Sequence, residues 1–211
     1  MGANCCTHTH EDQLHDSRYR RVLWAVLAVN GAMFLIEIIA GVTAGSASLQ
    51  ADALDFLGDA ANYGISLFVV GMALRYRAHA ALAKGITMGL FGLWVLGAAL
   101  LHAAAGTVPV AETMGAVGVA ALLANAASFA LLWAYKGGDS NMKSVWLCSR
   151  NDVIGNLAVL LAALGVFDLG KGWPDIVVAL VMACFAVQGA WVIIRLARAE
   201  LRVTRSPRVS V

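Results

Sequence analysis

Three aspartates lie close together in one strongly apolar stretch of the sequence, ADALDFLGDAANY, at residues 51–63. On an α-helix, where each residue advances by about 100°, Asp52, Asp55 and Asp59 fall within one narrow stripe. Asn62 falls on the same stripe, whereas the large apolar side chains point elsewhere. A carboxylate at the centre of a lipid-buried helix costs about 2.5–3.5 kcal/mol to insert. We therefore expect the stripe to face the interior of a bundle, toward water, a cation or both.

A second stretch, WLCSRNDVIGN, offers ligands with a matching spacing. Cys148 and Asp152 are four residues apart, so they share one face of a helix, with Arg150 almost opposite. The two stretches together supply three carboxylates and one thiolate, and zinc commonly takes four such ligands. Magnesium and calcium prefer oxygen alone, so the thiolate favours zinc or softer relatives such as cadmium. The predicted metal ligands are Asp55, Asp59, Cys148 and Asp152.

Other polar residues could support this site without binding the ion. Glu37 and Asn30 are seven residues apart on one face of the preceding apolar stretch, and they could orient the ligands. Glu37 could instead pair with Arg150, which itself could extend toward the cytoplasm or neutralise surplus carboxylate. Asp52 could equally be a cap at the outer end of its helix. The predicted supporting residues are Asp52, Glu37, Asn30, Asn62 and Asn151.

The ligand candidates also have plain structural interpretations. Asp55 and Asp59 could be neutral acids that hydrogen-bond between helices. Cys148 could be a small apolar side chain, as buried cysteines often are, and Cys184 in the last apolar stretch is expected to pack in that way. A metal site is favoured because two separate stretches each contain two possible ligands four residues apart, Asp55 and Asp59 in one and Cys148 and Asp152 in the other.

The N-terminal segment MGANCCTHTHEDQLHD concentrates cysteine and histidine. Such closely spaced side chains can capture soft divalent ions, although a solvated tail with no specific role is the alternative. We expect capture that aids delivery or sensing without being obligatory. The residues concerned are Cys5, Cys6, His8, His10 and His15.

The rest of the chain must position these residues, and its composition indicates how. The 211 residues are 60% hydrophobic and 13% charged, about half the charge of a soluble domain. A bilayer-crossing helix needs about 20 apolar residues, and six runs are long enough. The sequence therefore predicts an all-α polytopic membrane protein. The runs cover about residues 20–44, 49–74, 80–105, 113–135, 144–167 and 175–197.

The basic residues predict the orientation of these runs. Of the 15 lysines and arginines, all but Arg150 and Lys171 lie toward one side, which the positive-inside rule assigns to the cytoplasm. Both termini are then cytoplasmic, as residues 1–19 and 200–211, with the membrane domain at residues 20–199. Because topology accounts for the net charge of +2, it does not point to nucleic acid as a partner.

Three longer stretches resemble the cation diffusion facilitator family: FLIEIIAGVTAGSASLQADALDFLGDAANY, SNMKSVWLCSRNDVIGNLAVLL and GWPDIVVALVMACF. The resemblance extends over about residues 20–200. It implies a six-span exporter of divalent metals, usually zinc, that is driven by inward proton movement. Matched residue by residue, the family's ligand pairs fall on Asp55 and Asp59 and on Cys148 and Asp152.

Two departures from the family affect what the resemblance implies. Histidine is usual where this chain has Cys148, so the substrate could be Zn²⁺, Cd²⁺ or Co²⁺. The family also usually continues into a soluble cytoplasmic domain that supports dimers. This chain is expected to be a short member without that domain, and any homodimer would form through the membrane helices.

The sequence thus predicts a proton-coupled metal exporter that works by alternating access, in the inner membrane of a bacterium. It is not expected to be an enzyme, because the glycine-flanked motifs of intramembrane aspartyl proteases are missing and Cys148 would have no role in one. A membrane sensor or buffer that binds metal without moving it is the alternative.

Overall fold

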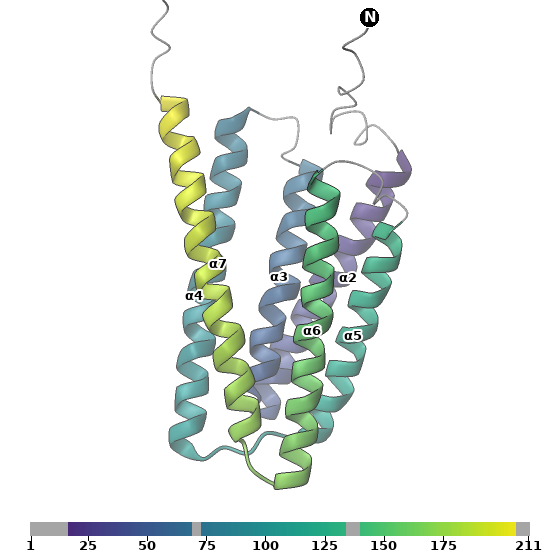
Figure 1. Cartoon of the computed structure of the whole chain (residues 1–211), viewed down its shortest axis with the longest axis vertical. Coiled ribbons are helices and arrows are strands. Elements are labelled where there is room, and N and C mark those ends of the chain that lie inside the picture. The colour runs from purple at the N-terminus through teal and green to yellow at the C-terminus, as the bar shows by residue number, and fades with distance from the viewer. Residues whose placement is uncertain (1–16, 69–72, 134–139, 206–211) are drawn as a thin grey trace, which may run out of the picture.

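The computed structural model describes residues 17–68, 73–133 and 140–205, apart from the side chains of residues 17, 19, 66, 74, 77, 140–151, 154 and 203–205. This part of the chain contains six α-helices and no strand, which confirms the predicted all-α fold. The helices run side by side along the long axis of the molecule (Figure 1). They are α2 (Ser17–Ala44), α3 (Ala47–Phe68), α4 (Leu74–Ala105), α5 (Ala111–Trp133), α6 (Ser140–Leu169) and α7 (Trp173–Arg205).

Four of these helices, α2, α4, α5 and α7, are long and apolar enough to cross a membrane, judged over the described residues. In the part of α6 whose side chains are described, the segment Gly155–Leu169 is also apolar. The fourth aspartate of interest, Asp152, precedes that segment, and α3 contains the other three.

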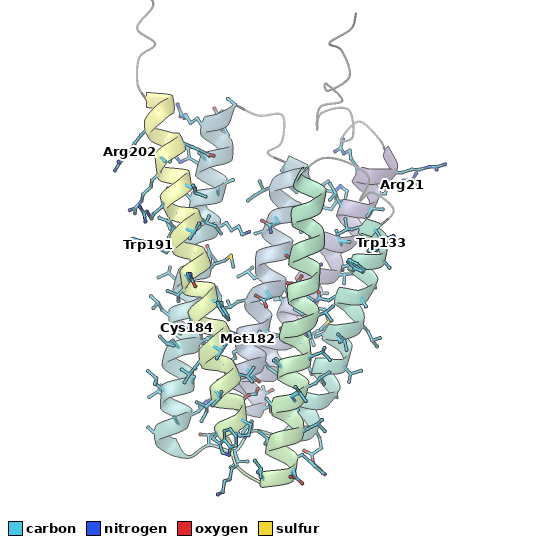
Figure 2. The ribbon with its side chains drawn as sticks, viewed as in Figure 1. Arg21, Trp133, Met182, Cys184, Trp191 and Arg202 are labelled. Atoms are coloured by element: carbon cyan, nitrogen blue, oxygen red, sulfur yellow. The ribbon has the colours of Figure 1, made fainter. Side chains whose placement is uncertain are left out.

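The described chain begins and ends at the same end of the bundle (Figure 1). Figure 2 shows Arg21 of α2 and Arg202 of α7 at this end. The exposed Lys171 lies in the turn between α6 and α7, at the opposite end. This distribution agrees with the predicted topology, and we refer to the two ends as inner and outer.

The helices pack as a group of four and a pair. In the group, α2 packs extensively on α3, α5 packs on α6, and α2 also contacts α5, whereas α3 and α6 meet only over a short stretch. The pair consists of α4 and α7, which pack on each other more extensively than any other two helices. The pair joins the group through α3 and α6 (Figure 1).

Glycines allow the closest helix contacts. A β-carbon at Gly41 of α2 would lie 2.8 Å from Cγ and 2.9 Å from the backbone nitrogen of Gln50 in α3. A β-carbon at Gly92 of α4 would lie 2.9 Å from Cγ2 of Val187 in α7. Small residues are used in this way where helices associate in lipid, because they let the backbones approach.

A carboxylate from α7 holds the outer end of α3. Asp175 Oδ1 accepts hydrogen bonds from the Ser46 hydroxyl at 2.6 Å and from the Ser48 hydroxyl and backbone nitrogen at 2.6 and 3.0 Å. Its Oδ2 accepts the backbone N–H of Ala47 at 2.8 Å. The first N–H groups of a helix have no partner within the helix and form its positive end. Asp175 therefore caps α3 from a different helix.

Candidate metal centre

The polar stripe of α3 consists of Asp52, Asp55, Asp59 and Asn62. The solvent exposure of these side chains increases from the outer to the inner end of the helix. Asp52, nearest the outer end, is buried with 1% of its surface exposed. Asp55 and Asp59 are half-buried, and Asn62 is exposed. The stripe is therefore exposed at its inner end and buried at its outer end.

The acids of α3 lie against α6. A β-carbon at Gly155 would lie 3.6 Å from Oδ2 of Asp55 and 3.9 Å from Oδ1 of Asp52. One turn toward the inner end of α6, the half-buried Asp152 is close enough to interact electrostatically with Asp52, Asp55 and Asp59. Four carboxyl groups from two helices thus face one region of the bundle.

These acids do not form a closed ligand set by themselves. Among the described side chains, no three from His, Cys, Asp and Glu are placed to hold one metal ion. The side chains of Cys148 and Arg150 lie outside the described part of the structure. The four-ligand site therefore stays a prediction. The other predicted residues outside the described part are Asn151, Cys5, Cys6, His8, His10 and His15.

Glu37 and Asp52 form a buried pair of acids between α2 and α3. Their exposed fractions are 0% and 1%, and no hydrogen-bond donor among the described residues reaches either carboxyl. The two carboxyls are near enough to interact electrostatically. The interpretation of Asp52 as a helix cap is wrong, since Asp175 of α7 fills that role.

The structure also describes Asn30 and Cys184. The side-chain nitrogen of Asn30 donates to the Val26 carbonyl at 2.7 Å and to the Ser128 hydroxyl at 3.4 Å, so it joins α2 to α5. Cys184, which we expected to pack, is exposed on α7.

Two further residues contact the stripe and were not predicted. Tyr63 hydrogen-bonds to Asp59, and its position one turn further along the same helix could have indicated this. Lys84 of α4 donates a hydrogen bond from Nζ to Oδ1 of Asn62, and its charge also acts on Asp59. No spacing rule connects Lys84 to α3, because the two helices are separate elements whose register is set by packing.

Comparison with known proteins identifies the family. The family described as the cation efflux transmembrane domain matches residues 23–201. The chain belongs to this family. Its members are membrane cation transporters and not enzymes, as the resemblance implied.

Curated relatives are similar over most of this chain. The metal cation efflux system protein CzcD of Cupriavidus metallidurans is 25% identical over 92% of this chain and 64% of its own length. The zinc transporter ZitB of Escherichia coli is 26% identical over 90% of this chain and 64% of its own length. A cadmium, cobalt and zinc/H⁺–K⁺ antiporter of Bacillus velezensis is 23% identical over 90% of this chain and 63% of its own length. The chain thus spans just under two thirds of these relatives.

Proposed function

We propose that this protein exports divalent metal ions, zinc or cadmium, through a site between α3 and α6, in exchange for protons. One observation carries the proposal: Asp55 and Asp59 of α3 and Asp152 of α6 lie within electrostatic reach of one another inside a membrane bundle. Acids inside a membrane protein are costly and mark ion pathways. A divalent cation is the ligand that such a concentration of negative charge favours.

The choice of metal follows from the ligand chemistry and from the relatives. The names of the three relatives refer to metal cations, to zinc, and to cadmium, cobalt and zinc. The thiolate of Cys148, added to the three carboxylates, would favour soft ions such as cadmium over hard ones.

The difference in exposure along α3 supports loading from the cytoplasm. Asn62 is exposed and Asp59 is half-buried, whereas Asp52 and the outer end of the helix are buried. Release to the outside then requires a second arrangement of the helices in which this difference is reversed. This is alternating access about one site.

Protons are the proposed counter-ion because carboxylates and thiolates bind a metal ion only after losing their protons. Protons that arrive from the outer side would therefore displace the metal from the same groups. The name of the Bacillus relative includes protons and potassium. We place the protein in a bacterial inner membrane, where a proton gradient drives the exchange, and we propose that it acts as a homodimer through its helices.

The test measures Zn²⁺ and Cd²⁺ uptake by proteoliposomes that contain the full chain. Asp59→Asn and Asp152→Asn keep the side-chain shape but remove both a ligand and a charge. Each should lower the initial uptake rate on the order of 100-fold and stop metal-driven proton movement.

Asp168→Asn is the matched control, because Asp168 is an exposed acid near the outer end of α6. It should transport as the unaltered protein does. Undiminished uptake by either site variant would contradict the site. Tight metal binding by the unaltered protein without any uptake would instead indicate a sensor or buffer.

A further inference from the structure

Lys84 occupies an unusual position for a lysine. It lies six residues inside the candidate membrane span Ala78–Ala105 of α4, or about 9 Å along the helix. Its side chain is half-buried, in contact with α3. Lysines at such depth are rare and face the interior of a bundle or a water-filled space, with a partner.

The partners of Lys84 belong to the polar stripe of α3. Its ammonium group donates a hydrogen bond to Oδ1 of Asn62 and interacts electrostatically with Asp59. Asn62 is exposed and Asp59 half-buried, so the ammonium lies at the inner, open end of the stripe. An ion that approaches Asp59 from the cytoplasm meets this positive charge first.

The same contact joins the two parts of the bundle. Lys84 belongs to α4, which packs chiefly on α7, whereas Asp59 and Asn62 belong to the group of four helices. In the outer half, α4 contacts α3 through a neutral hydrogen bond from Trp94 Nε1 to Gln50 Oε1, at 3.2 Å. The contact at Lys84 differs because it includes the attraction between the ammonium group and the carboxylate of Asp59. A metal ion bound at Asp59 would weaken that attraction.

We propose that Lys84 is a built-in counter-cation that competes with the metal ion for Asp59, and that its displacement loosens α4 from α3. The inference rests on the proposed transport function and adds a specific role in it. With the site empty, the ammonium balances Asp59. A divalent ion bound at Asp59 repels the ammonium group of Lys84. The contact between α4 and α3 then weakens, so that binding of the metal changes how the α4–α7 pair is held.

The experiment compares Zn²⁺ affinity with transport rate in the full chain. Zn²⁺ binding is measured by calorimetry in detergent, with Asp59→Asn as the background, and uptake is measured in proteoliposomes. Lys84→Gln removes the competing charge and should lower the Kd for Zn²⁺ on the order of tenfold. The same variant should slow maximal uptake several-fold, because the ion is held longer.

Two further variants separate charge from packing. Lys84→Arg keeps the charge and should bind Zn²⁺ within about twofold of the unaltered protein, while Lys84→Met, of similar length and uncharged, should behave as Lys84→Gln does. Lys171→Gln removes an exposed charge at the outer end and should change neither quantity. A lysine that only anchors the helices would leave the Kd unchanged or raised in Lys84→Gln and would lower only the melting temperature, which would overturn the proposal.

The outcomes also separate this inference from the function on which it rests. If Asp59→Asn abolishes binding and uptake but Lys84→Gln and Lys84→Met leave the Kd unchanged, the role of Lys84 is wrong and the transport site stands. If Asp59→Asn binds and transports Zn²⁺ normally, the site itself is wrong and the inference falls with it.

Discussion

At the scale of single residues, the acids of α3 share one face but not one environment. Asp52 is buried beside Glu37 without a donor from the described residues, whereas Asp55 and Asp59 are half-buried. Only the latter two carboxyls are partly exposed. This division favours Asp55 and Asp59 as ligands, with Glu37 and Asp52 as a neighbouring pair that shapes the charge around them.

Cys148 supplies the residue-scale prediction about metal choice. Replacing this thiol by imidazole in Cys148→His should shift preference from Cd²⁺ toward Zn²⁺ and Co²⁺, because a sulfur ligand is softer than a nitrogen ligand. We expect the ratio of Cd²⁺ to Zn²⁺ uptake to fall on the order of tenfold. Competition among the three ions in inside-out vesicles measures this ratio, and an unaltered ratio would mean that Cys148 does not bind the ion.

The residues of the site differ in how far they could be predicted from sequence. Asp55, Asp59 and Asp152 were predicted because acids are conspicuous in apolar stretches and a helix fixes which of them share a face. Lys84 was assigned only to the cytoplasmic side, where its charge suits the topology. Its contact with Asn62 depends on how α4 docks on α3, and no periodicity within one helix encodes that.

At the scale of the helices, Asp175 has an effect beyond its own helix. Its carboxylate accepts four hydrogen bonds from residues 46–48. The outer end of α3 is thereby held in place, and the position of the three aspartates along the bundle follows from that fixed end. The acid was visible in the sequence at the start of the last span, but its partners lie more than 120 residues away.

Asp175→Ala should therefore destabilise the protein strongly. Removing a buried, charged acceptor leaves two hydroxyls and two helix N–H groups without their partner, at a cost of about 2–4 kcal/mol. Asp175→Asn keeps one oxygen acceptor and should lose about half as much. Unfolding titrations in detergent compare both with Asp168→Ala, and equal stability of all three variants would contradict this role for Asp175.

The helix boundaries show where apolar runs and helices differ. The second run was predicted to extend to residue 74 and the third to begin at about residue 80, but Leu74 already belongs to α4. In contrast, α7 continues to Arg205, beyond the predicted 197, because a helix can extend into water once its apolar part has left the membrane.

At the scale of the whole molecule, the bundle consists of four helices around the acids and a pair beside them. Apolar runs predicted six helices, but they could not predict this grouping, because every run is apolar enough to pack against any other. Glycines such as Gly41 and Gly92 determine which helices approach most closely. Their role is visible only once the partners are known.

The closed outer end leads to a prediction about access. In a variant with Cys5, Cys6 and Cys184 replaced by serine, Asn62→Cys should react with a charged thiol reagent applied from the cytoplasmic side. Ala51→Cys, at a position with 2% exposure, should be protected from either side. The parent variant corrects for Cys148, and rapid labelling of Ala51→Cys from outside would show that the outer end is open.

The contact at Gly41 limits how such a bundle can move. With the backbones of α2 and α3 this close, one helix cannot slide along the other by a turn without a steric clash between Gln50 and its neighbour's main chain. A rotation that turns the aspartates of α3 toward the outer side would therefore have to move α2 and α3 together as one rigid unit. In the transport cycle that we propose, Glu37 would move together with Asp52, and the contact between them would be kept.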